Sequence, residues 1–511
     1  MLRKLRTAAA IALLVLITFY FVDFAGLLPE GFSVLARIQF VPAIFFHSAA
    51  ILGALIALTL LLGRLYCSAI CPMGIFQDVV TRIGGFFRKK KKRYKFSPAK
   101  NTLRYGFLAV MAVALISGFN LAVSLLDPYA AYGRIAANLF SPAYLAGNNL
   151  LEMIFTSFGN YTFYRMDIYM RSAFAVSVAI LTLFGIGYLA WKHGRAYCNT
   201  VCPVGTFLGL VSRFSLLKIR IDTSKCNGCG LCATRCKSSC IDSKNHRIDH
   251  SRCVDCFDCL DACRQNALSF SAPQGKKVVA QAPQPDAARR KFIATSLAAT
   301  LTMPVLMARG NRERRRARLR DENAHTRQVP ISPPGSLGHA HLERHCTACH
   351  LCVSKCPSHV LKPAFTEYGL AGMMQPMMYF DKGFCNFDCT VCSDVCPNGA
   401  ILPLTVEQKH LTQVGRVVFV ENFCIVHTDG TSCGACSEHC PTQAVSMVPY
   451  REGLTIPHTD PDICVGCGGC EYVCPAVPHK AIYVEGEKIH LQAKPFEDAE
   501  VHEEEIDGFG F

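Results

Sequence analysis

Residues 63–74 read GRLYCSAICPMG and residues 194–205 read GRAYCNTVCPVG, so the pattern G-R-x-Y-C-x3-C-P-x-G occurs twice. Each copy directly follows an apolar stretch about as long as a membrane-crossing helix. A C-x3-C spacing in a helix puts both sulfur atoms on one face, about one turn apart. The pairs Cys67/Cys71 and Cys198/Cys202 therefore predict four thiolates at one iron–sulfur centre between helices, of 4Fe-4S or 2Fe-2S type. The alternative is that these are redox-inert packing cysteines.

The next cysteines form two tight runs, each of the form C-x2-C-x2-C-x3-C, which in bacterial ferredoxins holds cubane iron–sulfur clusters. Zinc sites prefer two separated C-x2-C pairs, and disulfide frameworks have scattered cysteines, so both are disfavoured. In two-cluster ferredoxins the fourth cysteine of each run ligates the other cluster. The predicted 4Fe-4S ligand sets are Cys226, Cys229, Cys232 with Cys263, and Cys253, Cys256, Cys259 with Cys236. Cys240 is left over, and we expect a buried thiol.

Four further runs lie nearer the C-terminus, and each ends in a cysteine followed by proline, as in bacterial ferredoxins. They are Cys346, Cys349, Cys352, Cys356; Cys385, Cys389, Cys392, Cys396; Cys424, Cys433, Cys436, Cys440; and Cys464, Cys467, Cys470, Cys474. Sixteen thiolates predict four 4Fe-4S clusters, which makes six in the chain before the C-x3-C pairs are counted. Either neighbouring runs exchange their fourth cysteines, or the first run pairs with the fourth and the second with the third.

The first of these runs also contains the C-x-x-C-H signature of haem attachment at residues 346–350. The same cysteines open a complete cluster run, so we reject haem and expect His350 at the surface.

The composition predicts that part of the chain lies in a membrane, because 51% of its 511 residues are hydrophobic. Four apolar stretches approach the ~20 residues that cross hydrocarbon. Ten basic residues lie between 82 and 104, and the loop 127–171 carries no net charge. The excess of basic charge at one end predicts that both ends of this helical unit face the cytoplasm. Much of the net charge of +15 lies beside these stretches, so nucleic acid is not an expected partner. The predicted spans are residues 7–24, 43–63, 105–126 and 172–191.

The expected fold class is an α-helical membrane unit of four main spans, with a fifth anchor helix, joined to α+β ferredoxin-like domains. The expected parts are a membrane unit (1–220), a two-cluster module (221–271), a linker (272–335), a four-cluster domain (336–495) and an acidic tail (496–511). The linker contains a twin-arginine-like signal and the anchor at 289–308, which favour export of the second domain. Seven arginines between 309 and 320 favour retention on the cytoplasmic side instead.

The paired motifs followed by a two-cluster ferredoxin resemble the membrane polyferredoxin family, which includes the NapH-like subunit of the periplasmic nitrate reductase quinol dehydrogenase. That resemblance covers residues 1–271. Residues 288–491, with Arg289-Arg290, Pro333-Pro334-Gly335 and four cluster runs, resemble the exported NapG-like partner. The chain thus resembles a NapH–NapG fusion. The resemblance implies a multi-pass protein of the bacterial inner membrane that oxidises quinol and reduces a periplasmic reductase or c-type cytochrome. Its first module would be cytoplasmic and its second domain periplasmic.

A quinol site needs a polar group within an apolar wall. The candidates near the outer span ends are Asp23, Gln39, His47, Asp127 and Arg134. Asp127 could instead cap a helix before Pro128, and His47 could be a satisfied helix residue.

Modules on opposite sides would be separated by ~30 Å of hydrocarbon, too far for an electron to cross without an intermediate centre. Two other functions stay open: a cytoplasm-facing electron supply for maturation or reactivation of a metalloenzyme, and a non-catalytic assembly or sensing protein. No Gly-rich dinucleotide loop follows a strand, so NADH or flavin is not an expected donor.

Overall fold

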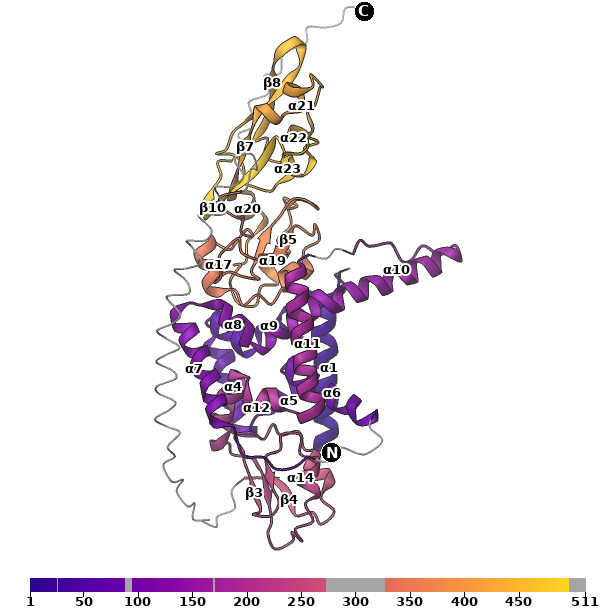
Figure 1. Cartoon of the computed structure of the whole chain (residues 1–511), viewed down its shortest axis with the longest axis vertical. Helices are drawn as coiled ribbons and strands as arrows, with labels where there is room; N and C mark the ends of the chain where they lie inside the picture. Colours follow the sequence, from indigo (N-terminus) through magenta and orange to yellow (C-terminus); the bar gives the residue numbers. More distant parts are fainter. Residues whose placement is uncertain (25, 88–93, 169–170, 273–326, 496–511) are drawn as a thin grey trace, which may run out of the picture.

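The computed structural model describes residues 1–24, 26–87, 94–168, 171–272 and 327–495. They form an elongated stack of three parts, with a helical unit in the middle (Figure 1). The first cluster module lies at one end of the helical unit, and the second cluster domain lies at the other. The expected twin-arginine signal, the anchor at 289–308 and the acidic tail 496–511 lie outside the described residues.

Two helices of the helical unit, α1 (Leu2–Val22) and α11 (Ala173–His193), are long and apolar enough to cross a membrane by length and composition. The expected spans 43–63 and 105–126 are each interrupted. The first is divided into α3 (Phe40–Phe45) and α4 (Ala49–Leu62), and the second into α7 (Asn101–Ser117) and α8 (Asn120–Leu126). The breaks fall at His47 (φ 52°) and Gly118 (φ 71°), where a left-handed residue ends a helix. The four-helix membrane unit therefore stays a prediction.

Short helices fill the interior between these long ones. The two motifs lie on α5 (Leu65–Ala69) with α6 (Pro72–Phe86), and on α12 (Ala196–Thr200) with α13 (Pro203–Val211). Both α6 and α13 begin with proline, whose missing N–H is unneeded in the first turn. The remaining elements are η1 (Glu30–Ser33), α2 (Val34–Arg37), α9 (Pro128–Ile135), the π-helical η2 (Ala136–Phe140), α10 (Ser141–Ser157) and η3 (Ser212–Phe214).

Helix α9 is buried at every residue and packs against α6 and α11. The carboxylate of Asp127 caps it, accepting hydrogen bonds from Tyr129 N at 3.0 Å and Ala130 N at 3.1 Å. Because such a cap satisfies amides that lack helical partners, α9 can begin inside the protein. The Asp127 side chain thus caps the start of the following helix α9, and not the end of the preceding apolar stretch as the capping alternative proposed.

The first cluster module is a small α+β unit. Strand β1 (Lys218–Ile221) pairs antiparallel with β4 (Leu268–Ser271), so the module begins a few residues before the expected boundary at 221. Between them lie two short helices and a second strand pair. These are α14 (Leu231–Arg235), β2 (Ile241–Asp242), β3 (Arg247–Ile248) and α15 (Asp258–Ala262).

The second domain is built around β7 (Thr412–Phe419) paired antiparallel with β10 (Ile482–Gln492). Two further pairs, β5 (Leu361–Pro363) with β6 (Pro376–Met378) and β8 (Val445–Pro449) with β9 (Thr455–Thr459), complete it. Short helices connect the strands and the cysteine loops. They are α17 (His339–His345), α18 (Leu351–Lys355), α19 (Val391–Asp394), α20 (Val406–His410), η5 (Glu421–Phe423), α21 (Ile425–Thr428), α22 (Ala435–Glu438), η6 (Arg451–Gly453) and α23 (Gly469–Val473).

Candidate iron–sulfur sites

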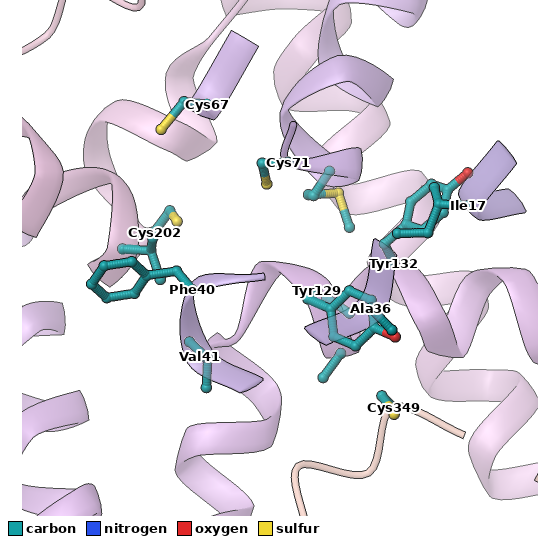
Figure 2. Close-up of a cluster of buried hydrophobic side chains, with 14 of the residues drawn as sticks. Ile17, Ala36, Phe40, Val41, Cys67, Cys71, Tyr129, Tyr132, Cys202 and Cys349 are labelled. Carbon is teal, nitrogen blue, oxygen red and sulfur yellow. The ribbon is translucent and has the colours of Figure 1, made fainter. Parts of the chain in front are cut away.

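The four cysteines of the two motifs come together in the core of the helical unit. Each is 4% exposed, and all four belong to one buried cluster (Figure 2). Burial raises the pKa of Cys202 well above its usual value, and the nearby sulfur atoms of Cys198, Cys71 and Cys67 raise it further. Four thiols that oppose one another's ionisation suit a metal centre, because its positive charge stabilises the thiolates.

Each motif is hydrogen-bonded to the other through its arginine. Arg64 of the first copy donates to the carbonyl of Cys198 at 3.2 Å and to Asn199 Oδ1 at 2.9 Å. Arg195 of the second copy donates to the carbonyl of Cys67 at 2.6 Å. Both arginines are at most 1% exposed. Each arginine therefore stabilises the cysteine helix of the other motif.

The last glycine of each motif leaves room for the arginine of the other copy. A Cβ added at Gly205 would overlap the carbonyl oxygen of Cys198 and lie 2.8 Å from Arg64 Nη2. A Cβ at Gly74 would overlap the carbonyl of Cys67 and lie 2.9 Å from Arg195 Nη1. The glycine and the arginine of the repeated pattern are thus explained by one close contact.

Hydrogen-bond donors surround the sulfur atoms. Gln77 Nε2 lies 3.1 Å from Cys198 Sγ, and Gly205 N lies 3.3 Å from Cys202 Sγ. Arg64 Nη2 lies 3.8 Å from Cys67 Sγ. Cations and N–H groups near sulfur stabilise thiolate and tune the reduction potential of an iron–sulfur cluster. Gln77 lies outside the repeated pattern, and nothing in the sequence distinguished it.

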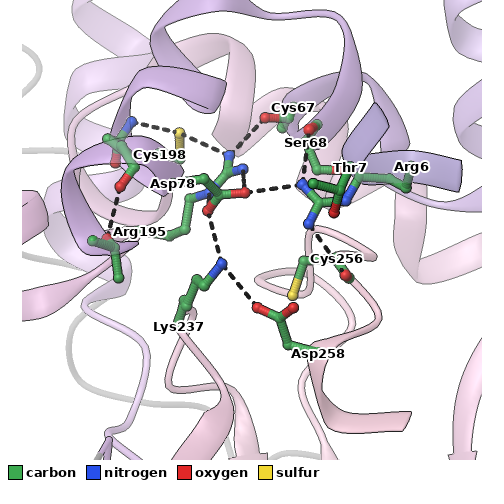
Figure 3. A network of polar contacts seen from close by, with 12 residues as sticks. Arg6, Thr7, Cys67, Ser68, Asp78, Arg195, Cys198, Lys237, Cys256 and Asp258 are labelled. Carbon is green, nitrogen blue, oxygen red and sulfur yellow. Dashed lines mark hydrogen bonds and ion pairs between the residues drawn. The ribbon is translucent and has the colours of Figure 1, made fainter. Parts of the chain in front are cut away.

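A buried charge network joins this site to the first cluster module (Figure 3). Asp78 on α6 accepts from Arg195 Nε at 2.9 Å and from Arg6 Nη1 at 3.0 Å. Lys237, which follows Cys236 in the sequence, lies 3.6 Å from Asp78. Although burial acts to raise the pKa of Asp78, Arg195, Lys237 and Arg6 hold it well below its usual value. The carboxylate therefore stays charged between three cations.

The first module brings its cysteines together in the predicted sets. One cavity is lined by Cys226, Cys229, Cys232 and Cys263, and another by Cys236, Cys253, Cys256 and Cys259. Cys240 is buried as expected, but it lines the second cavity, with its sulfur 3.4 Å from Cys236 Sγ. Among the described residues, no three His, Cys, Asp or Glu side chains gather closely enough to hold a single metal ion. Cavities ringed by four sulfur atoms suit a larger, multi-atom centre.

In the second domain, the fourth cysteine of each run lies beside the first three cysteines of the neighbouring run. Burial raises the pKa of Cys352, and the nearby sulfur atoms of Cys349, Cys346 and Cys396 raise it further. The pKa of Cys392 is raised in the same way by burial and by Cys385, Cys356 and Cys389. The pKa of Cys470 is raised by burial and by Cys467, Cys464 and Cys440. The fourth set lines one cavity and comprises Cys424, Cys433, Cys436 and Cys474. This arrangement decides between the two pairings that the sequence left open.

The five quinol-site candidates separate into two groups. Asp23, His47 and Arg134 face the second domain: Lys355 Nζ lies 3.0 Å from Asp23 Oδ2, the rings of His47 and His345 are 6.5 Å apart, and Arg134 donates to Ala348 O at 3.3 Å. Gln39 and Asp127 lie inside the helical unit. Gln39 accepts a hydrogen bond from the hydroxyl of the motif residue Tyr66 at 3.0 Å, and Asp127 caps α9.

The expectation that His350 lies at the surface was wrong. His350 is 2% exposed, and its ring nitrogens lie 3.0 Å from Asn138 Nδ2 and 3.0 Å from Met374 O. Burial, together with the charge of Arg134, lowers its pKa to about 3, so the ring is neutral. The helical unit covers this loop, and that docking cannot be seen in the local sequence.

Comparison with known proteins places iron–sulfur domains along the chain. A family described as "4Fe-4S binding domain" matches residues 44–94 and 172–222, which contain the two motifs. Two families described as "4Fe-4S dicluster domain" match residues 431–477 and 249–360. No solved structure matches the chain.

Individual relatives are ferredoxin-type proteins. The methylamine utilization ferredoxin-type protein MauM of Methylobacillus flagellatus is 32% identical over 28% of this chain and 63% of its own length. The ferredoxin-type proteins NapG and NapF of Escherichia coli are 29% and 26% identical, each over 30% of this chain, and over 71% and 85% of their own lengths. The chain thus spans a little under two thirds of MauM. It contains several 4Fe-4S binding domains and is similar to ferredoxin-type electron-transfer proteins.

Proposed function

We propose that this protein is a quinol dehydrogenase component of the bacterial inner membrane. It oxidises quinol in the helical unit and passes single electrons through 4Fe-4S clusters to a periplasmic reductase or c-type cytochrome. The observation that carries this proposal is that the helical unit, which buries the four motif cysteines, lies between two parts whose cysteines line cavities (Figure 1). Six 4Fe-4S clusters and a seventh iron–sulfur centre at the motifs account for 28 of the 29 cysteines.

Short contacts connect successive sets. In the first module, α14, which contains Cys232, packs against α15, which contains Cys259. Arg195 Nη1 lies 4.0 Å from Cys198 Sγ, and its ion-pair partner Asp78 also binds Arg6, which donates to the carbonyl of Cys256 at 3.4 Å. In the second domain the amide of Cys385 donates to the carbonyl of Cys467 at 2.9 Å, which joins the first pair of runs to the second. Contacts that join each set to the next support electron transfer over a structural use of the clusters.

The outer surface of the helical unit supports insertion into lipid. Val15 on α1 is 59% exposed, and Leu181 and Phe184 on α11 are 73% and 70% exposed. Rows of exposed apolar side chains are unusual on soluble proteins. Helix α10 extends sideways from the bundle and exposes Leu150 and Met153, as suits a helix lying at a lipid surface (Figure 1). Ten basic residues lie between 82 and 104 in the sequence, and Tyr94 within this segment donates its N–H to Thr234 O of the first module at 3.0 Å, which favours the cytoplasm for that module.

Quinol-driven bleaching of the visible iron–sulfur absorbance tests this function. Anaerobically purified protein should contain iron and inorganic sulfide, and reduced quinol should bleach it. Cys464→Ser should abolish reduction of a cytochrome acceptor. Gly185→Ala, which adds a methyl group where no atom lies within 4 Å, should retain that activity. Protein that dithionite bleaches and quinol does not would show that quinol is not the donor.

A cytoplasm-facing electron supply for metalloenzyme maturation is the second candidate, favoured by the seven arginines between 309 and 320. The two functions differ in the side on which residues 336–495 lie. Protease added to intact spheroplasts should cut this domain if it is periplasmic. Full protection there, with cutting after lysis, would favour the cytoplasmic function.

A further inference from the structure

The motif site and the second domain are far apart in sequence, and the short helix α9 lies between them. Helix α9 packs on one side against α6, which begins directly after Cys71. On its other side, α9 meets the loop that carries Cys349. Figure 2 shows Tyr129 of α9 between Cys71 and Cys349.

Gly133 allows α9 to approach the loop that carries Cys349 unusually closely. A Cβ added at this position would lie 2.5 Å from the carbonyl oxygen of Cys349 and 2.9 Å from Cζ of Phe21. The backbone of α9 thus rests directly on the backbone of the loop, with no side chain between them. Real Cβ atoms essentially never approach a neighbour this closely, so only glycine fits without a shift.

Neighbouring contacts hold the loop in this position. Arg134 donates to Ala348 O at 3.3 Å, and Asn138 Nδ2 lies 3.0 Å from His350 Nδ1. The three consecutive residues 348–350 are therefore each in contact with α9 or η2. Farther along, Lys355 forms an ion pair with the buried Asp23 at 3.0 Å. Such contacts fix the second domain against the helical unit.

We propose that α9 is the bridge by which electrons pass between the motif site and the set Cys346, Cys349, Cys352 and Cys396, and that Gly133 sets the distance. The width of one helix is about 10 Å, whereas a bilayer core measures about 30 Å. One electron is lost at the motif site and one is gained at the loop of the second domain, and no bond forms or breaks. The inference rests on cluster binding in the proposed function, but not on quinol as the donor.

Electron paramagnetic resonance of the full-length protein, partly reduced with dithionite, tests this bridge without quinol. The signal that is missing in Cys71→Ser identifies the motif centre. In the wild type this signal should be broadened by reduced centres nearby, and Cys396→Ser should remove the part of the broadening that comes from the second domain. Gly133→Ala should weaken it and slow reduction of the second domain several-fold. Gly147→Ala is the matched control, because no atom lies within 4 Å of a Cβ placed there.

Equal broadening in Gly133→Ala and wild type would overturn the role of Gly133. Absence of broadening in wild type, with both centres reduced, would overturn the bridge itself. If Gly133→Ala lost iron on purification, the comparison of wild type with Cys396→Ser would still decide. A wild type that shows broadening but is not reduced by quinol would keep the bridge and reject the quinol donor.

Discussion

Neutralising Asp78 should destabilise the junction between the helical unit and the first cluster module. Its carboxylate lies 2.8 Å from Arg195 Nη2 and 3.0 Å from Arg6 Nη1, and the side chains of these three residues are 7%, 1% and 4% exposed. Asp78→Asn keeps the shape but leaves the buried cations without a counter-charge. Breaking a buried ion pair by removing one partner costs about 3–5 kcal/mol.

The assay is thermal unfolding of anaerobic protein at one scan rate, followed with iron content. For a folded unit as large as the helical unit, a loss of about 3–5 kcal/mol in the free energy of unfolding lowers the melting temperature by on the order of 10 °C. Asp222→Asn is the control, because Asp222 and Lys225 form an exposed pair at 3.9 Å, and exposed ion pairs contribute little to stability. Equal shifts for the two variants would refute the reasoning that the network is held by buried charge.

Two further predictions concern the second domain and the motif site. Burial lowers the pKa of His490 in the folded protein to about 4, whereas an unfolded histidine titrates at about pH 6.5. Below about pH 6.5 the unfolded state therefore binds the proton more tightly than the folded state does. The stability of the second domain should therefore fall from pH 7 to 5, and His490→Gln should flatten that fall; an unchanged pH profile would count against a buried neutral ring. Gly205→Ala should lose iron selectively at the motif site, because its Cβ would meet Arg64 Nη2 at 2.8 Å. Gly185→Ala, with open space around its Cβ, should keep the full iron content, and equal iron in both variants would contradict the packing argument.

The ligand sets of the first module could be predicted because three of their cysteines lie within seven residues, so the site is encoded locally. The partners of Cys356 and Cys396 could not be predicted in this way, since two pairings satisfy the same spacing. Hydropathy also missed the helix breaks at His47 and Gly118, which are conformational and leave the apolar character of each stretch unchanged. His350 is buried because parts of the chain more than 200 residues apart dock against each other, and local sequence does not show this docking.

The repeated motif shows why its two copies belong to one site. Arg64 is buried against the second copy, and Gly205 is the residue that leaves space for it. Arg195 and Gly74 repeat this relation in the opposite direction. A single copy would bury an arginine without its acceptors, at the cost of an unpaired charge in the core. Arginine and glycine at these positions therefore require the second copy, and their mutual contact brings four thiols to one place.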